Sequence, residues 1–354
     1  MSRSDGWIRP APEGLYCEAG DFYIDPWGPV PRAVITHAHS DHARRGCGAY
    51  LTSAENVPLL THRVGPAAIQ GLPWGQTLRV GGVEVTFYPA GHIRGAAQVR
   101  LAYRGEVWVI TGDYKRQADP TTLPFEPLRC HTLVSECTFG LPIYRWEPPD
   151  RVIADIAAWW AQCAAAGKNA LLYAYALGKA QRLLAMLPPL GPIYVHGSIA
   201  AINAIYEAEG VRLAPWERAT AWRKGTRGAL ILAPPSVHRS RWVEPFAPYE
   251  EGQVSGWMAI RGRRRQRNID RGFVLSDHAD FPALVQTLQE SQAQQVIFTH
   301  GYTHEMQVYA ASRGYAAYLW ETAYAGEVDS ESDGPAGGSA PDDSAGELPS
   351  GASA

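Results

Sequence analysis

The chain has 354 residues, of which 46% are hydrophobic and 19% charged, a balance that excludes a fibrous or wholly disordered protein. No run of 18 apolar residues occurs and the first 14 residues contain no apolar signal segment, so we expect a cytoplasmic protein that does not bind membranes. The net charge of −3 is unevenly distributed, because residues 327–354 contain seven acidic side chains and no basic one. That segment is poor in apolar residues and cannot offset its ordering entropy, so we predict a disordered acidic tail.

Six short apolar segments, each about as long as a strand, end in a side chain that can bind a ligand. In chain order their last residues are His37, His92, Asp113, Glu136, His278 and His300. In open α/β sheets, ligands bind where the strands end. The pattern therefore predicts a ligand site built from these strand ends.

Between Glu136 and His278 the pattern changes to alternating helices and strands, which is typical of a small parallel α/β unit. The first helix of this unit is predicted over 150–167, where an amphipathic segment ends in glycine. The potential ligands lie on both sides of the unit. We therefore predict an inserted domain over 141–265.

One loop is dense in potential metal ligands. The segment AVITHAHSDHARRG, residues 33–46, contains His37, His39, Asp41 and His42. Imidazole nitrogens and carboxylate oxygens suit zinc or another first-row divalent metal. The alternation turns His37 and His39 to one side, whereas Asp41 and His42, beyond a turn, can face a second point. The loop could therefore serve two neighbouring ions. The alternative is a polar loop whose histidines cap a helix.

The motif HAHSDH in this loop resembles the signature of the metallo-β-lactamase superfamily of metallohydrolases. The segments AGHIRGAAQ, with His92, and ITGDY, with Asp113, are similar to further ligand segments of that superfamily. Three later segments resemble motifs A, B and C of its β-CASP nucleases, namely SECTFG with Glu136, SDHADF with His278 and FTHG with His300. The resemblance implies an α/β fold, a metallo-β-lactamase αββα sandwich with an inserted β-CASP α/β domain, divided into 1–140, 141–265 and 266–326.

The resemblance also implies a centre of two divalent ions, zinc or alternatively manganese. The ligands it implies are His37, His39 and His92 for the first ion, Asp41, His42 and His300 for the second, and Asp113 as a bridge between them. Two such ions can activate water and clamp a phosphodiester. The sequence is therefore interpreted as that of a phosphodiesterase.

Three side chains are candidates for catalysis beside the metals. Asp41 or Asp113 would orient the attacking water or accept its proton. His278 would bind the phosphate or protonate the leaving oxygen, and Glu136 would fix the tautomer of its ring. We expect the catalytic residues to be Asp41, Glu136 and His278.

An arginine-rich segment, RGRRRQRN, precedes the strand that ends at His278 and also resembles a β-CASP feature. It supplies five candidate phosphate contacts, Arg261, Arg263, Arg264, Arg265 and Arg267. The alternative is a solvated loop without a role in binding. Beside a phosphodiesterase centre, we favour nucleic-acid binding.

The opening PEGLYCEAGDFYIDPWGPVPRAVITHAHSDHARRG resembles the bacterial ligase-associated DNA exonuclease branch. The resemblance implies hydrolysis of DNA, as single strands or at ends and from 5′ to 3′, in repair beside a DNA ligase and a helicase. One position favours RNA instead, because a histidine in motif C, His300 here, is typical of RNA-processing members. A small-molecule hydrolase would lack an insert of this length, and a non-catalytic nucleic-acid-binding scaffold would lack some of the seven ligands. The oligomeric state is left open.

Overall fold

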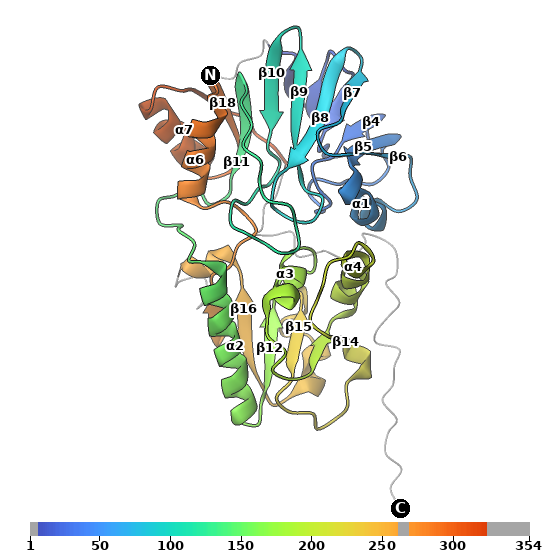
Figure 1. Ribbon diagram of the computed structural model, residues 1–354, viewed down its shortest axis with the longest axis vertical. Helices are drawn as coiled ribbons and strands as arrows, with labels where there is room; N and C mark the ends of the chain where they lie inside the picture. Colours follow the sequence, from blue (N-terminus) through green and yellow to red (C-terminus); the bar gives the residue numbers. More distant parts are fainter. Residues whose placement is uncertain (1–5, 261–268, 324–354) are drawn as a thin grey trace, which may run out of the picture.

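Two sheets that share one hydrophobic core form the upper part of the molecule (Figure 1). The computed structural model describes residues 6–260 and 269–323. The first sheet is formed in chain order by β1 (Ile8–Ala11), β2 (Gly14–Cys17), β3 (Phe22–Ile24), β4 (Arg32–Val34), β5 (Ala49–Ser53) and β6 (Ile69–Leu72). Its pairs are antiparallel up to β3 and parallel from β3 to β6.

The second sheet has seven strands in the order β19-β18-β11-β10-β9-β8-β7. Their bounds are β7 (Thr77–Val80), β8 (Val83–Pro89), β9 (Ala97–Tyr103), β10 (Glu106–Ile110), β11 (Thr132–Cys137), β18 (Gln295–Gly301) and β19 (Ala316–Leu319). The strands from β10 to β19 are parallel, and Val134 pairs with both Ile110 and Ile297. The ends of β10, β11 and β18 therefore meet at one edge of the sheet.

Helices cover the outer faces of both sheets. On the first sheet, α1 (Val57–Val64) packs its buried Leu60 with Ile35 and Tyr50. On the second sheet, α6 (Phe281–Ser291) and α7 (Thr303–Ser312) pack with residues of β11 and β18. The layer order is therefore helix, sheet, sheet, helix.

A third, fully parallel sheet forms the lower part (Figure 1), in the order β14-β13-β15-β12-β16-β17. Its strands are β12 (Asn169–Tyr173), β13 (Ile193–Val195), β14 (Glu217–Arg218), β15 (Leu230–Ala233), β16 (Tyr249–Val254) and β17 (Arg271–Phe273), and its helices are α2 (Pro149–Ala165), α3 (Lys179–Met186) and α4 (Gly197–Ala208). The helix predicted over 150–167 is confirmed as α2. Short 3-10 helices lie at Ala54–Asn56, Ala219–Ala221, Pro235–Val237, Arg241–Phe246 and Gly256–Ala259.

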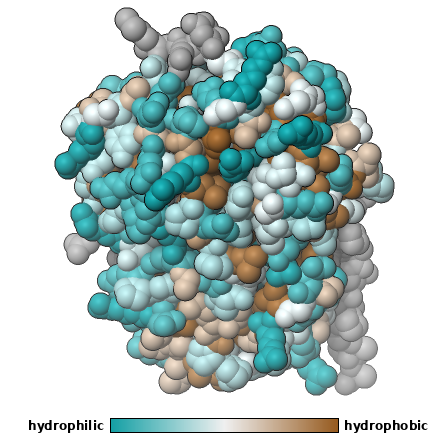
Figure 2. Space-filling view, turned by 45° about the horizontal axis from the view of Figure 1, so that its top comes forward, coloured by the Kyte–Doolittle hydropathy of each residue, from teal (hydrophilic) through white to brown (hydrophobic). Residues whose placement is uncertain are grey.

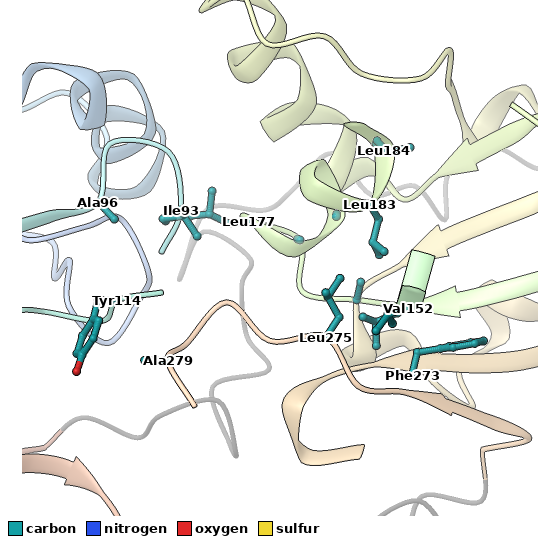
Figure 3. Packing of buried hydrophobic residues seen from close by; sticks show 14 of the residues in the cluster. Ile93, Ala96, Tyr114, Val152, Leu177, Leu183, Leu184, Phe273, Leu275 and Ala279 are labelled. Carbon is teal, nitrogen blue, oxygen red and sulfur yellow. The ribbon is translucent and has the colours of Figure 1, made fainter. Parts of the chain in front are cut away.

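The upper and lower parts are joined by a continuous apolar core. One buried cluster contains Ile93 and Tyr114 from loops of the upper part together with Leu177 and Leu183 at and within α3 (Figure 3). Gly178 stands at their contact, because with φ at +92° a Cβ there would lie 2.3 Å from Cγ2 of Ile93. The start of α3 is therefore packed against the loop that follows β8.

The structure confirms the mixed α/β class expected from the sequence. On the face drawn in Figure 2, hydrophilic side chains predominate and apolar ones form small separate areas. Within 6–260 and 269–323, none of the helices has both the length and the apolar character of a bilayer span. The predicted tail, 327–354, lies outside the described residues.

Candidate metal centre

Seven of the predicted site residues converge on an eighth, Asp113. They form three groups of side chains whose potential ligand atoms lie within 4.8 Å of one another. The groups are His37, His39, His92 and Asp113; His42, Asp113 and His300; and Asp113, Glu136 and His278. Asp41 is in none of these groups, which were searched over the described residues, and its Oδ2 lies 3.8 Å from Nε2 of His42.

The loop after β4 turns its histidines in two directions. Main-chain amides of His42 and Ala43 donate to the carbonyl of His39, so the chain reverses at that residue. Nε2 of His37 lies 3.1 Å from Nδ1 of His39, whereas His42 lies in the second group. The small Ala38 between them is fully buried and leaves room for both rings. The turn expected within HAHSDH is therefore present.

The two carboxylate oxygens of Asp113 face different groups of imidazoles. Oδ2 lies 3.5 Å from Nε2 of His37 and 3.8 Å from Nε2 of His92. Oδ1 lies 2.9 Å from Nε2 of His300 and 3.5 Å from Nε2 of His42. This is the arrangement expected of a carboxylate that bridges two cations.

Asp113 reaches this position because of the residue before it. Gly112 has φ at +54°, and a Cβ there would lie 2.7 Å from the side chain of Thr36. Glycine adopts this conformation without the steric cost that other residues pay. The turn after β10 can therefore press against the loop after β4 and bring the carboxylate to the histidines.

Burial and neighbouring charges shift the pKa values of the histidines in these groups. Burial lowers the pKa of His37 and of His92 well below the usual value, so both rings are neutral and offer a lone pair. Burial also opposes charge on His42, but the carboxylates of Asp113, Asp41 and Asp25 outweigh it and raise the pKa of His42 to about 10. His42 is therefore protonated in the metal-free protein, and a metal that binds its Nε2 would have to displace that proton. Neutral imidazoles around shared carboxylates are a donor set that suits divalent metals of the first row. The residues therefore fit two such ions.

Hydrogen bonds to the outer ring nitrogens orient the imidazoles. Nδ1 of His42 donates to Oδ2 of Asp25 at 2.7 Å. Nδ1 of His37 donates to Oγ1 of Thr36 at 3.0 Å, and that hydroxyl in turn donates to Asp25 at 2.6 Å. Nδ1 of His300 lies 3.1 Å from Oγ1 of Thr299. Each of these bonds leaves Nε2 directed at the centre, which is how outer partners fix the tautomer of a ligand histidine.

The other two rings are oriented by main-chain carbonyls from distant parts of the chain. Nδ1 of His92 donates to the carbonyl of Asp277 at 2.7 Å. Nε2 of His39 lies 3.2 Å from the carbonyl of Leu177, just before α3, so His39 presents Nδ1 to the centre. The lower part of the molecule therefore contributes directly to the orientation of a candidate ligand.

Glu136 and His278 form a buried pair beside this centre. Nδ1 of His278 lies 2.9 Å from both carboxylate oxygens of Glu136, and its Nε2 lies 4.0 Å from Oδ2 of Asp113. The main-chain amide of Tyr114 also donates to Glu136, at 2.8 Å. The structure thus brings together the two residues for which the sequence predicted a joint role.

Sequence reasoning missed the residues that orient the rings. Asp25 follows an apolar strand, β3, in the same way as the predicted ligands, and this signal could have identified it. Asp277 stands directly before His278 in SDHADF, but nothing in the motif indicates that its carbonyl meets His92. The predicted arginines, Arg261, Arg263, Arg264, Arg265 and Arg267, lie outside the described residues.

A large cavity borders the centre at His300. It has a volume of about 1110 Å³ and is lined by Trp27, His300, Thr303 and Trp320, among others. Its walls come from the ends of β1, β18 and β19, from the loops after β1 and β3, and from the start of α7. Of the candidate ligands among the described residues, His300 is the one that lines this cavity.

The chain is similar in sequence to several known proteins. No protein-family model matches the chain. It is 30% identical over 321 residues to a "Probable DNA ligase" of Opitutus terrae, a match that covers 88% of this chain and 31% of that protein. It is 31% identical over 147 residues to the "Endoribonuclease ysh1" of Emericella nidulans, covering 37% of this chain and 16% of the relative. A match to "Cleavage and polyadenylation specificity factor subunit 3" of Dictyostelium discoideum has 30% identity over 123 residues, 34% of this chain and 15% of that protein.

A solved structure from Enterococcus faecalis, titled as a protein of unknown function, has a similar fold. It covers 82% of this chain and 79% of its own, with a TM-score of 0.57 and 13% sequence identity. The chain spans about a third of the length of the ligase relative and about a sixth of the other two. Fold and site together define a mixed α/β protein with a candidate centre of histidines and carboxylates. The chain belongs to the β-CASP family of the metallo-β-lactamase superfamily.

Proposed function

We propose that this chain is a metal-dependent DNA exonuclease that hydrolyses phosphodiester bonds from the end of a strand, from 5′ to 3′, in DNA repair. The observation that carries the proposal is the position of Asp113, whose two oxygens face two separate groups of buried imidazoles. Two-cation centres of this kind serve the in-line displacement of phosphodiesters. The DNA ligase named among the relatives supports DNA as the substrate.

The layers of the fold support a domain assignment. We propose that the helix, sheet, sheet, helix layers are the αββα sandwich, and that the third sheet is the inserted β-CASP domain. β11 and β18 pair in one sheet although the third sheet lies between them in sequence. Because β17 (Arg271–Phe273) pairs with β16, the proposed insert extends past 265 to about residue 274.

We propose that His37, His39 and His92 hold one ion, that His42 and His300 hold the other with Asp41 close by, and that Asp113 holds both. The ions, which we propose to be zinc, activate water and neutralise phosphate charge when bound. Two side chains beside the ions, Glu136 and His278, position and donate a proton. Glu136 accepts the Nδ1 hydrogen of His278, so Nε2 is the nitrogen that faces the centre. In its imidazolium form, His278 donates from Nε2 to a phosphate oxygen or to the leaving oxygen.

Single-stranded substrates labelled at either end test the proposal. DNA and RNA strands with a 5′ or a 3′ label are incubated with the protein and Zn²⁺ or Mn²⁺, with His37→Ala as the control. We expect stepwise shortening of DNA from its 5′ end, abolished in His37→Ala. A wild-type protein inert on all four substrates would refute nuclease activity.

RNA cleavage is the second candidate function. It is supported by the endoribonucleases among the relatives and by the histidine of motif C, His300. In the same experiment, internal cleavage of RNA with intact DNA would favour this alternative.

We also propose protein partners for this chain. The relative named "Probable DNA ligase" contains a region similar to this chain within a protein about three times as long. This supports a functional link to a DNA ligase, and we extend it to a helicase as part of the proposed repair role. We also propose phosphate contacts by the arginines of 261–268, which removal of Arg264 and Arg265 would test through the salt dependence of binding.

A further inference from the structure

Five buried charged side chains lie where α3 faces the loop that contains His92, and we call them the buried charge cluster. They are Lys115, Asp119, Lys179, Arg182 and Asp277. Every one has a side chain at most 4% exposed. Three cations share two carboxylates in a place that water does not reach. Such groups are costly to bury unless they are paired, and each of the five has an oppositely charged neighbour within the cluster.

Asp277 is where three segments of the chain meet. Its Oδ1 lies 3.8 Å from Nζ of Lys115, in the loop after β10, and 3.6 Å from Nη1 of Arg182, on α3. Its Oδ2 lies 3.5 Å from Nζ of Lys179, at the start of α3. Asp277 itself follows β17 and stands next to His278. The carboxylate thus ties motif B to both parts of the molecule.

Asp119 completes the cluster without meeting the metal centre. Its Oδ2 lies 2.6 Å from Nζ of Lys115 and 3.5 Å from Nε of Arg182. Its Oδ1 accepts from the amide and hydroxyl of Thr121. Asp119 therefore shares Lys115 and Arg182 with Asp277 but has its own local partners, which makes it a matched control.

The main chain of Asp277 connects this cluster to the centre. Its carbonyl accepts the hydrogen bond from Nδ1 of His92 at 2.7 Å. Nζ of Lys115 donates to the carbonyl of His92 at 3.1 Å, and Nη1 of Arg182 donates to the carbonyl of Ser276 at 2.9 Å. The backbone of His92 and the segment whose carbonyl orients its ring are therefore both bonded to cations of the cluster.

We propose that Asp277 is a positioning residue, whose carboxylate, held by Lys115, Lys179 and Arg182, fixes the carbonyl that orients His92. Any residue has a carbonyl, but only an anion at this position can be held by three cations from two parts of the chain. His92 is then kept in the tautomer that carries hydrogen on Nδ1 and presents Nε2. Because two of the cations are on α3, the orientation of this ligand depends on the packing of α3. The inference rests on the proposed metal-dependent function.

The packing around the cluster supports this dependence. Ile93, next to His92, is buried against the turn that leads into α3, and Gly178 permits their close contact (Figure 3). A displacement of α3 would therefore move apolar and charged contacts of the His92 loop together.

The test compares Asp277→Asn with Asp119→Asn in the full chain. Both variants remove one negative charge from the same cluster, but only the first removes the anion beside the carbonyl that orients His92. The first readout is the Nδ1–H signal of His92 in proton–nitrogen spectra of metal-free protein labelled on histidine, assigned with His92→Gln. The second is Zn²⁺ affinity, measured by competition with a chromophoric chelator.

We expect Asp277→Asn to lose the protected Nδ1–H signal and to bind Zn²⁺ at least about tenfold more weakly, as for other lost partners of ligand histidines. Asp119→Asn should keep the signal and an affinity close to that of the wild type. Equal behaviour of the two variants, or a retained signal in Asp277→Asn, would overturn the proposal.

A second variant covers the case in which Asp277→Asn does not fold. Lys179→Met removes the contact from α3 and leaves Asp277 with two cations, and we expect it to weaken the same signal and the same affinity. Wild-type values in Lys179→Met would refute the dependence on α3. If the wild type cuts no nucleic acid, the proposed function fails, whereas the Nδ1–H signal still decides this inference without metal.

Discussion

Substitution of Asp25 tests whether the hydrogen bonds outside the centre orient His42 and stabilise the fold. The Asp25 side chain is buried and accepts three hydrogen bonds, from the amide of Thr36 at 2.8 Å, from the hydroxyl of Thr36 at 2.6 Å and from Nδ1 of His42 at 2.7 Å. Asp25→Ala leaves all three donors without this acceptor in a place closed to water. We therefore expect a loss in the free energy of unfolding and a loss of orientation in His42.

The magnitude follows from the number of donors. A buried donor left unsatisfied costs about 1 to 3 kcal/mol, so three donors lower the free energy of unfolding by about 3 to 9 kcal/mol. The same change removes one of the carboxylates that raise the pKa of His42, so that pKa falls from about 10. Urea denaturation of metal-free protein measures the first effect, and titration of the His42 ring by NMR measures the second.

Asp21 provides the matched control for this variant. It lies four residues earlier, also has positive φ, and pairs with Tyr16 and Arg32 at the exposed surface. Asp21→Ala carries the same backbone strain, but water replaces its lost partners. If Asp25→Ala costs no more than about 1 kcal/mol beyond Asp21→Ala, the value of one ordinary hydrogen bond, the reasoning is wrong.

Three other predictions concern the same centre. Glu136→Gln should keep both metals, measured by elemental analysis, and lower kcat about 10- to 100-fold because His278 loses its carboxylate partner; loss of metal would contradict this. Asp113→Asn should bind fewer than two ions per chain, because an amide offers a single oxygen for two sites, and full stoichiometry would count against a bridge. Burial opposes charge on Asp277, but the cations around it hold its pKa well below the usual value. Its stabilising effect is therefore fully present above about pH 4 and fades as the pH falls toward the lowered pKa, so the difference in unfolding free energy between the wild type and Asp277→Asn should be smaller at pH 3 than at pH 6.

The amino-acid sequence was sufficient to predict which strand ends carry candidate ligands. Runs of Val, Ile and Leu stop at His37, Asp113, Glu136 and His300, and parallel neighbours in one sheet bring three of these ends to one edge. Such signals are local, because a buried strand needs apolar residues and a ligand needs a polar one. The mixed α/β class and the helix α2 followed from the same periodicities. The domain boundaries and the role of Asp41 stay predictions.

Which nitrogen of each ring faces the centre depends on contacts between segments that are distant in sequence. His39 is oriented by a carbonyl 138 positions away, and His92 by one 185 positions away. The start of α3 lies between these two contacts, and no periodicity or motif in its sequence indicates that Lys179 is buried against Asp277. A ring's tautomer depends on the partner of its outer nitrogen, and that partner is supplied by the packing of segments that are distant in sequence.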